Sequence, residues 1–342
     1  MNPKPILVSI ILCTSSRADD LRLTLEAIGR LSVPADLSCE LIVVDNASAD
    51  ATPEVVRASA LETMPLRYVS EPRRGKGYAY NRGMAEADGD IFLFTDDDVR
   101  PPQNWILGMC ELIRAGHADA VAGGVKLAPY LHRPWLTEKH ARWLASTEFL
   151  PSGVPINLVG ANMAFSRRVL EKVPQFDPEL GPGATGMGDE TLFSQQLSAA
   201  GYRIVMALDI VAEHHLHADR LTRSSFAVLA RKLGASNAYI SWHWAHDGPR
   251  FAAAALIRAW AALWVRRVQH FPEWVTSSTV PAWELQLLDT LHTRRHYLAE
   301  RKRPRNYEKR GLVKRGSHPA SQLVHPGASA PNLPGKGKGT ER

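Results

Sequence analysis

The residues of this chain best suited to chemistry are three consecutive aspartates, Asp96, Asp97 and Asp98, at the end of a short apolar run. Residues 91–94 have the composition of a buried parallel strand. The carboxyl ends of such strands open onto the ligand crevice of a doubly wound sheet. Acids placed together there need a counter-ion, and Mg²⁺ or Mn²⁺ prefers one or two carboxylates plus phosphate oxygens of a substrate. The pattern predicts a site for a divalent cation and a phosphorylated ligand; the alternative is a solvated acidic turn.

A basic, glycine-containing loop leads into the helix that precedes the strand of the aspartates. Residues 73–83 read Arg-Arg-Gly-Lys-Gly-Tyr-Ala-Tyr-Asn-Arg-Gly, and such a loop presents backbone N–H groups and cations to an anion. A Gly-x-Gly by itself is a weak signal. Its place one helix before the acidic strand end gives the predicted cation a phosphate partner, with Arg74 and Lys76 facing that phosphate.

A second acidic pair, Asp189 and Glu190, follows a glycine-rich run at residues 181–188. It is far enough along the chain from the aspartates for the fold to place it across a cleft. A carboxylate there can take a proton from an attacking hydroxyl, and a general base typically contributes about 10²–10⁴-fold to a rate. His214 and His215, at the exit of an extended segment, are either site residues or solvated and core histidines.

The elements that must position these residues follow from alternating apolar runs and helix-like periodicity. Strand–helix–strand spacing is typical of βαβ units, so we expect an α/β fold, Rossmann-like, with a mostly parallel central sheet and helices on both faces. Strands are expected at residues 6–13, 41–44, 66–69, 91–94, 118–126, 159–165 and 202–211.

The composition changes after Arg220, and this change divides the chain. Residues 1–220 carry the strands and the candidate site, whereas residues 221–300 have helical patterns rich in Trp, Ala, Leu and Arg. Residues 301–342 are rich in Pro, Gly, Lys and Ser, which bury too little apolar surface to stay ordered. We therefore predict a catalytic domain, a helical C-terminal region and a disordered basic tail.

The charge of the chain is concentrated in that tail. The formal net charge is +6, but residues 301–342 alone carry eleven Lys or Arg against two Glu, so the first 300 residues are net acidic. The high pI does not make the globular part a nucleic-acid binder. The three cysteines lack metal-ligand spacing, and we expect them to be buried in a reducing compartment.

A membrane-surface helix is predicted near residues 251–268, where Arg258 and Arg266 accompany Trp260 and Trp264. That composition suits an anionic membrane surface, and the alternative is a helix packed on the catalytic domain or on a second subunit. No apolar run reaches the length of a transmembrane helix. We expect a cytoplasmic protein, peripheral on the inner face of the plasma membrane if this helix binds lipid.

Six short motifs in a fixed order resemble those of family 2 nucleotide-sugar glycosyltransferases with the GT-A fold. The resemblance covers about residues 5–220, and the ordered set is more specific than any one motif. The motifs are Ser9-Ile-Ile-Leu-Cys-Thr14, Leu41-Ile-Val-Val-Asp-Asn46, Arg74-Gly-Lys-Gly77 with Asn81-Arg-Gly83, Thr95-Asp-Asp-Asp98, Gly160-Ala-Asn-Met163 and Gly188-Asp-Glu190.

The resemblance implies a nucleoside diphosphate sugar as donor and Mn²⁺ or Mg²⁺ as cofactor. Asp45 would contact the nucleotide base, although Asp-Asn-Ala-Ser also suits an Asx turn. Asp98 would bind the metal directly, with Asp96 at the other end of the motif and His214 or His215 completing the metal or diphosphate site. The further donor contacts implied are Thr14, Arg17, Arg74, Lys76, Asn81, Asp96 and Asp97.

The resemblance also implies a catalytic base in the second acidic pair. The family has Glu-Asp where this chain has Asp189-Glu190, which leaves open which carboxylate takes the role; by position we favour Glu190. Trp135, His140, Trp143 and Asn162 are the candidates for the acceptor pocket, with packing roles as the alternative.

The activity implied is transfer of a sugar to a hydroxyl of a saccharide or lipid-linked acceptor, with inversion, in synthesis of envelope polysaccharide or glycolipid. The rival from another class is a non-catalytic nucleotide-sugar-binding module that acts as a membrane or partner scaffold. A sugar-phosphate nucleotidyltransferase would need a glycine-rich loop after the first strand, and residues 14–17 do not form one.

Overall fold

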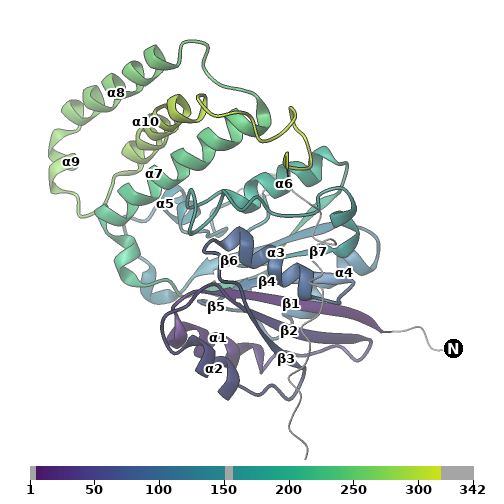
Figure 1. The fold of residues 1–342 in the computed structure, drawn as a ribbon. Coiled ribbons are helices and arrows are strands. Elements are labelled where there is room, and N and C mark those ends of the chain that lie inside the picture. The colour runs from purple at the N-terminus through teal and green to yellow at the C-terminus, as the bar shows by residue number, and fades with distance from the viewer. Residues whose placement is uncertain (1–4, 151–156, 317–342) are drawn as a thin grey trace, which may run out of the picture.

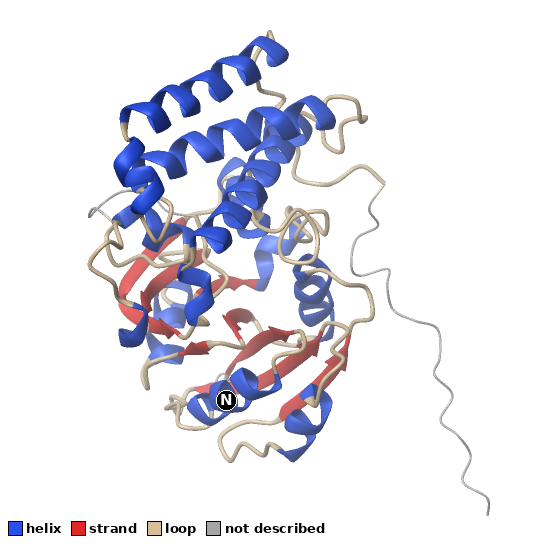
Figure 2. Cartoon of the chain, turned by 90° about the vertical axis from the view of Figure 1, so that its left-hand side faces the viewer, coloured by secondary structure: helices blue, strands red, loops and turns tan. Residues whose placement is uncertain are grey.

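The computed structural model describes residues 5–150 and 157–316. In that part of the chain one eight-stranded sheet has helices on both faces, and a further group of helices stands above one end (Figures 1 and 2). The predicted α/β architecture is confirmed. In sheet order the strands are β3 (Leu66–Ser70), β2 (Leu37–Asp45), β1 (Ile6–Thr14), β4 (Ile91–Asp96), β7 (Met163–Ser166), β6 (Ala120–Leu127), β8 (Ile204–His214) and β5 (Val99–Arg100).

The parallel half of the sheet brings the predicted donor residues to one edge. Strand β1 pairs in parallel with β2 on one side and β4 on the other, so Thr14 lies beside Asp45, and Cys13 beside Asp96. The continuous Val/Ile/Leu run of β1 is buried on both faces, as expected where helices cover the sheet on either side. The chemistry-bearing ends of three strands therefore meet.

The other half of the sheet is mixed. Strand β7 is antiparallel to both β4 and β6, and β5 is antiparallel to β8, while β6 and β8 are parallel. The two residues of β5 directly follow the aspartates, and Val99 pairs with His214. This pairing brings the acidic strand end and the histidine segment together.

Side chains that alternate along the strands pack into two hydrophobic cores, one on each face of the sheet. Ile10 and Leu12 belong to the core under α1 (Ala18–Ile28), α2 (Thr52–Ala58) and α4 (Trp105–Arg114). Ile11 belongs to the opposite core, which α3 (Lys76–Glu86) and α6 (Asp189–Ala199) cover. The three cysteines are buried and free, as predicted.

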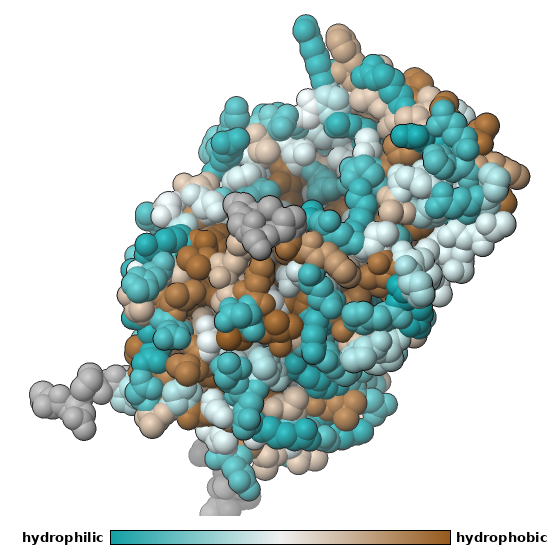
Figure 3. All heavy atoms as spheres, turned by 180° about the vertical axis from the view of Figure 1, so that it is seen from behind, coloured by the Kyte–Doolittle hydropathy of each residue, from teal (hydrophilic) through white to brown (hydrophobic). Residues whose placement is uncertain are grey.

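The helical C-terminal region is confirmed, and a buried ion cluster joins its helices. Glu284 accepts from Arg223 at 3.0 Å and from Arg267 Nη2 at 2.6 Å. These residues lie on three different helices, so the cluster ties the group together. Apolar residues, brown in Figure 3, alternate with hydrophilic ones where α8 and α9 form the end of the molecule. The helices are α7 (Arg223–Tyr239), which continues into the π-helix η4 (Ile240–Ala245), α8 (Ala252–Gln269), α9 (Phe271–Thr276) and α10 (Ala282–Glu300).

Several elements differ in extent from the sequence prediction. Helix α6 begins at Asp189 rather than at residue 191, so the acidic pair forms its first turn. Strand β8 runs three residues further than expected and ends on His214. The strand predicted from residue 159 begins only at Met163. Between β6 and β7 the chain forms the short 3₁₀ helix η1 (Pro129–Leu131) and α5 (Glu138–Trp143), and after β7 and β8 it forms η2 (Arg167–Glu171) and η3 (Ala218–Leu221).

The predicted disordered tail is wrong for residues 301–316, which fold back onto the catalytic part. Tyr307 is 2% exposed and donates to Asp177 Oδ2 at 2.8 Å, where Tyr239 of α7 also donates at 2.6 Å. Lys314 reaches Asp177 Oδ1 at 2.6 Å. A buried carboxylate thus gathers three donors, which composition alone does not reveal. The rest of the predicted tail lies outside the described residues.

Across the described residues, no helix combines the length and apolar character needed to cross a bilayer.

Replacing Tyr307 should destabilise the whole fold. Because the ring is buried and its hydroxyl serves Asp177, Tyr307→Ala should lower the free energy of unfolding by about 3–5 kcal/mol, and Tyr307→Phe by about 1–3 kcal/mol. Urea unfolding followed by circular dichroism measures both. The matched control is Val313→Ala in the same segment, 48% exposed, which should change stability by less than about 0.5 kcal/mol. Equal effects of the two alanine variants would contradict a folded role for this segment.

Candidate active site

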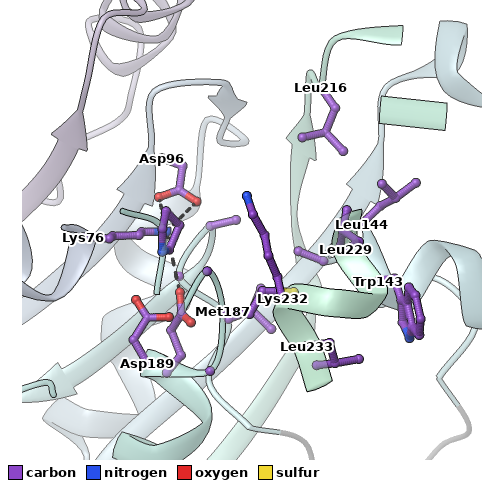
Figure 4. A pocket seen from close by; sticks show the side chains of 18 of the residues that line it. Lys76, Asp96, Trp143, Leu144, Met187, Asp189, Leu216, Leu229, Lys232 and Leu233 are labelled. Atoms are coloured by element: carbon purple, nitrogen blue, oxygen red, sulfur yellow. Dashed lines mark hydrogen bonds and ion pairs between the residues drawn. The ribbon is translucent and has the colours of Figure 1, made fainter. Parts of the chain in front are cut away.

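A cavity of about 1040 Å³ lies between the carboxyl edge of the sheet and helix α7. One wall, here called the polar wall, comes from the strand ends and the start of α3 and α6; the opposite, apolar wall comes from α7 and the segments around α5 and β8 (Figure 4). The polar wall includes Thr14, Arg17, Arg74, Lys76, Asp96, Asp97, Asp98, Asp189, Glu190 and His214. The apolar wall includes Trp143, Leu144, Leu216, Leu229 and Leu233, together with polar side chains of the same segments such as Arg142, Ser225 and Lys232.

Arg17 holds two of the three aspartates. Its guanidinium contacts Asp97 Oδ1 at 3.0 Å and Asp98 Oδ2 at 2.9 Å, and Thr14 Oγ1 donates to Asp97 Oδ2 at 2.7 Å. Burial, together with the charge of Asp98, raises the pKa of Asp97 to about 7 even though Arg17 and Thr14 oppose the shift. The acids predicted at the strand end are thus largely dehydrated and depend on Arg17 to remain together.

Asp98 makes a second contact, with His214. The Nε2 atom of His214 lies 3.2 Å from Asp98 Oδ1, because the β5–β8 pairing sets the two residues side by side. Burial raises the pKa of Asp98, but His214 and Arg17 outweigh it and hold this pKa well below its usual range. Asp98 is therefore ionised.

The side chains where β4 ends are of the kinds that bind divalent cations. A carboxylate and an imidazole are both ligands that Mn²⁺ accepts, Asp98 and His214 are in contact, and His214 Nδ1 is buried without a hydrogen-bond partner among the described residues. Within those residues no group of three or more His, Cys, Asp or Glu side chains is close enough to hold a metal. A cation that takes one or two protein carboxylates and completes its shell with phosphate oxygens or water does not need such a group.

Lys76 connects the aspartates with the second acidic pair. Its ammonium lies 2.8 Å from Asp96 Oδ1 and 3.6 Å from Glu190 Oε1. Burial lowers the pKa of Lys76, but Asp96, Tyr80 and Glu190 together raise it well above its usual value. The backbone N–H of Lys76 donates to Pro182 O at 2.8 Å, which ties the basic loop to the glycine-rich run before α6. Lys76 is thus a fixed positive charge between two acids from distant parts of the chain.

The acidic pair is split in its protonation. Burial and the neighbouring Glu190 raise the pKa of Asp189 well above its usual range. Burial acts in the same direction on Glu190, but Lys76 and Asp189 outweigh it and lower the pKa of Glu190. The opposite directions of the two pKa shifts favour Glu190 as the ionised member of the pair.

Two residues predicted to contact the nucleotide sugar make hydrogen bonds within the protein instead. Asp45 is 3% exposed, accepts from Tyr68 Oη at 2.7 Å and caps the following turn through Ser48 N at 2.9 Å, the Asx-turn geometry. Asn81 exchanges two hydrogen bonds with the backbone of Phe176, at 2.9 and 2.8 Å. Arg74, by contrast, lines the cavity as predicted.

Of the predicted acceptor residues, Trp143 lines the cavity and the other three pack elsewhere. His140 is buried, where it completes a capping box with Thr137 and contacts Val280 O at 2.7 Å. Trp135 packs edge-on against His140. Asn162 is fully buried in the sheet, bonded to Gly124 O and Ile210 O at 2.8 Å each. The polar groups of His140 and Asn162 are thus used by internal partners, as is usual for buried polar groups, and Trp135 contributes ring packing.

His215 is also directed elsewhere than the sequence suggested. Its Nε2 atom lies 2.8 Å from Glu213 Oε1, and its ring lies near Tyr130. Of the adjacent histidines, only His214 lines the cavity.

Sequence reasoning missed the contribution of α7, above all Lys232. This side chain extends from α7 towards Asp96 and Lys76 (Figure 4). A methyl group on Gly186, whose φ is +111°, would lie 2.6 Å from Lys232 Cδ, so the glycine allows the loop to seat the lysine stem. In the part of the chain that the structure describes, no carboxylate is within ion-pair distance of its ammonium. Because Lys232 is a single lysine on a helix and far in sequence from every motif, nothing in the sequence identified it as a site residue.

Comparison with known proteins agrees with the geometry. Residues 9–173 match the family model described as Glycosyl transferase family 2. Glycosyltransferase AglE of Haloferax volcanii is 25% identical over 210 residues, or 60% of this chain and 66% of that protein. Glycosyltransferase AglD of the same organism is 31% identical over 121 residues, or 34% of this chain and 19% of that protein. The chain therefore spans less than two thirds of the length of either relative.

Among solved structures, the mannosyltransferase PcManGT from Pyrobaculum calidifontis, in complex with GDP-Man and Mn²⁺, is similar in fold. It is 20% identical, with a TM-score of 0.52, and the match covers 93% of this chain and 78% of that one. The likeness extends beyond the strands into the helical C-terminal region. The ordered motifs, the sheet and the family match agree: residues 9–173, about half of the chain, match glycosyl transferase family 2, and the chain has the GT-A fold.

Proposed function

We propose that the chain is a metal-dependent glycosyltransferase that moves a sugar from a nucleoside diphosphate to an acceptor hydroxyl with inversion, using Glu190 as the base. The observation that carries the proposal is the place of Lys76, between Asp96 at 2.8 Å and Glu190 at 3.6 Å. This contact puts the two acidic groups on one cavity, close enough to serve the two sides of a single reacting carbon.

The polar wall supports binding of the nucleotide and diphosphate. Thr14 and Arg17 lie at the end of β1, where the crevice of a parallel sheet accepts a nucleotide. Asp98 and His214, with Asp96, would hold Mn²⁺ or Mg²⁺, which as a Lewis acid neutralises charge on a departing diphosphate. Arg74 and Lys76 add positive charge on the same side. Asp45, although bound within the protein, ends β2 beside Thr14 and remains our candidate for the nucleotide base.

The ionisation of the acidic pair supports Glu190 over Asp189 as the base. A group that accepts a proton must be ionised beforehand, and Glu190 is the member whose pKa is lowered. Asp189 is buried behind it with a raised pKa. A carboxylate that deprotonates the attacking hydroxyl on the face opposite the leaving diphosphate gives inversion through an oxocarbenium-like transition state.

The apolar wall supports an acceptor with an apolar part. Leu216, Leu229 and Leu233 face the cavity opposite Asp96 and Lys76 (Figure 4). A free sugar would leave these side chains against water, whereas a lipid-linked acceptor would cover them. We therefore favour a lipid-linked acceptor over a free saccharide, consistent with glycolipid or envelope polysaccharide synthesis. The nucleotide sugar and Mn²⁺ bound by PcManGT are compatible with this donor class.

Removing the base should stop transfer without loss of donor binding. Glu190→Gln should lower kcat about 10²–10⁴-fold, whereas Asp189→Asn, which substitutes a group already uncharged, should cost less. Release of nucleoside diphosphate with Mn²⁺ measures turnover, and a thermal shift with donor measures binding. If Asp189→Asn lowers kcat more than Glu190→Gln does, Asp189 is the base. Unchanged turnover in both variants would show that neither carboxylate is the base.

Adding one methyl group at Gly160 should displace the base. A Cβ there would overlap Glu190 Oε1 and Tyr80 Oη and lie 3.0 Å from Lys76 Nζ. Gly160→Ala should therefore lower kcat at least about tenfold, as misplacement of a reacting group does, while donor binding is largely kept. The matched control is Gly29→Ala, whose methyl would lie 3.3 Å or more from its neighbours and outside the cavity. Normal kcat in Gly160→Ala would show that Glu190 is not held against this glycine during catalysis.

Removing divalent cations should abolish turnover. After EDTA treatment Mn²⁺ should restore activity, and His214→Ala should raise the Mn²⁺ concentration for half-maximal rate by about tenfold or more, since even an outer-sphere partner contributes 10–100-fold to metal affinity. The control is His217→Ala, which removes an exposed histidine of the same segment, bonded to Asp20. Full activity in EDTA would refute metal dependence.

A further inference from the structure

The exposed side of α8 and α9 carries many large apolar side chains. In the described residues, fifteen large hydrophobic side chains are exposed, and eight of them fall between residues 251 and 275. Single exposed hydrophobics are normal, but a contiguous group marks an interaction surface. These eight, which we call the α8–α9 face, are Phe251, Ile257, Trp260, Trp264, Val265, Val268, Phe271 and Val275.

The fold itself does not require this face. Helix α8 packs inward through small residues and one leucine: its buried positions are Ala252, Ala255, Ala259 and Leu263. Trp260 is 55% exposed and Val268 is 72% exposed on the other side. Helix α8 thus packs on α10 through its small residues, and these larger side chains stay exposed. Ile257 and Trp260 also border a groove that Leu291 and Arg295 of α10 line.

The exposed charges around the face are mainly positive, with Glu273 of α9 as the exception. Arg258 and Arg266 are exposed along α8, and Arg250 precedes it. Arg267 is taken up by Glu284 at 2.6 Å, and its guanidinium lies 5.2 Å from the Trp264 ring centre. The sequence from Arg250 to Thr276 holds one acid, Glu273. The complement of this face is thus apolar and anionic.

We infer that the α8–α9 face docks on an anionic lipid bilayer, with α8 lying in the plane of the interface. The aromatic and aliphatic side chains would enter the headgroup–acyl boundary, and Arg258 and Arg266 would reach lipid phosphates. A second copy fits less well, because a two-fold contact through this face would set its arginines against one another. A protein partner would need both an apolar groove and acids at matching positions. The inference rests on the surface alone and not on the identity of the sugar acceptor.

Vesicle flotation with the full chain tests the docking. We expect the protein to float with phosphatidylcholine vesicles that contain about one quarter phosphatidylglycerol, and to float less with pure phosphatidylcholine, since anionic lipid attracts nearby Arg residues. The double variant Trp260→Ser and Val268→Ser should lose about tenfold or more of the partitioning, because burial of apolar area drives it. Arg258→Glu with Arg266→Glu should abolish the preference for the anionic vesicles.

The matched control is the double variant Leu23→Ser and Leu107→Ser, which removes exposed hydrophobics of α1 and α4 and should float like the wild type. Circular dichroism melting and donor turnover with a water-soluble acceptor analogue should be unchanged in the face variants, which lie outside the cavity. Equal flotation of both serine double variants would overturn the docking surface. Light scattering that shows a dimer lost in the Trp260→Ser and Val268→Ser variant, without vesicle binding, would assign the face to a second copy instead. Loss of turnover in Glu190→Gln bears only on the proposed chemistry and leaves this result unaffected.

Discussion

The neutralisation of buried acids at the carboxyl edge of the sheet is the constraint on which the rest of this site depends. Asp97 and Asp98 are almost inaccessible to water and adjacent in sequence. Arg17 bridges them, and His214 contacts Asp98 from a different strand. Loss of one partner of a buried ion pair costs about 3–5 kcal/mol, because the remaining charge is left uncompensated. The strand ends, the start of α1 and the end of β8 are therefore held in one arrangement by charge as well as by packing.

Lys76 extends this network to the second acidic pair. It is the first residue of α3, and its ammonium serves Asp96 and Glu190 together. The same contact that keeps Glu190 ionised also sets its distance from the aspartates. Asp189, buried with a raised pKa, lies behind Glu190 as a neutral support. One lysine thus contacts acids from both parts of the site and lowers the pKa of Glu190.

The helical C-terminal region contributes directly to the cavity. Helix α7 forms the apolar wall of the cavity and contributes Lys232, and its Tyr239 binds Asp177 alongside Tyr307. Residues 301–316 thereby fasten α7 to the segment that leads into the glycine-rich run before α6. The same helical group presents the α8–α9 face to the outside. Its inner side completes the cavity, and its outer side has the composition of a bilayer-facing surface.

The sequence by itself determined the local features: which runs form buried strands, which residues stand at their ends, and that the motifs occur in the order of family 2. The apolar runs of β1 and β4 predicted that Thr14 and Asp96 stand at the ends of strands, as they do. Tertiary structure alone decided which distant residues meet. The β5–β8 register selected His214 over His215, burial in the sheet gave Asn162 a structural role, and three donors around Asp177 ordered a segment whose composition predicts disorder. The physical reason is that ion pairs and hydrogen bonds between distant residues depend on how the chain folds. The sequence around each residue has no periodic pattern that identifies its partner.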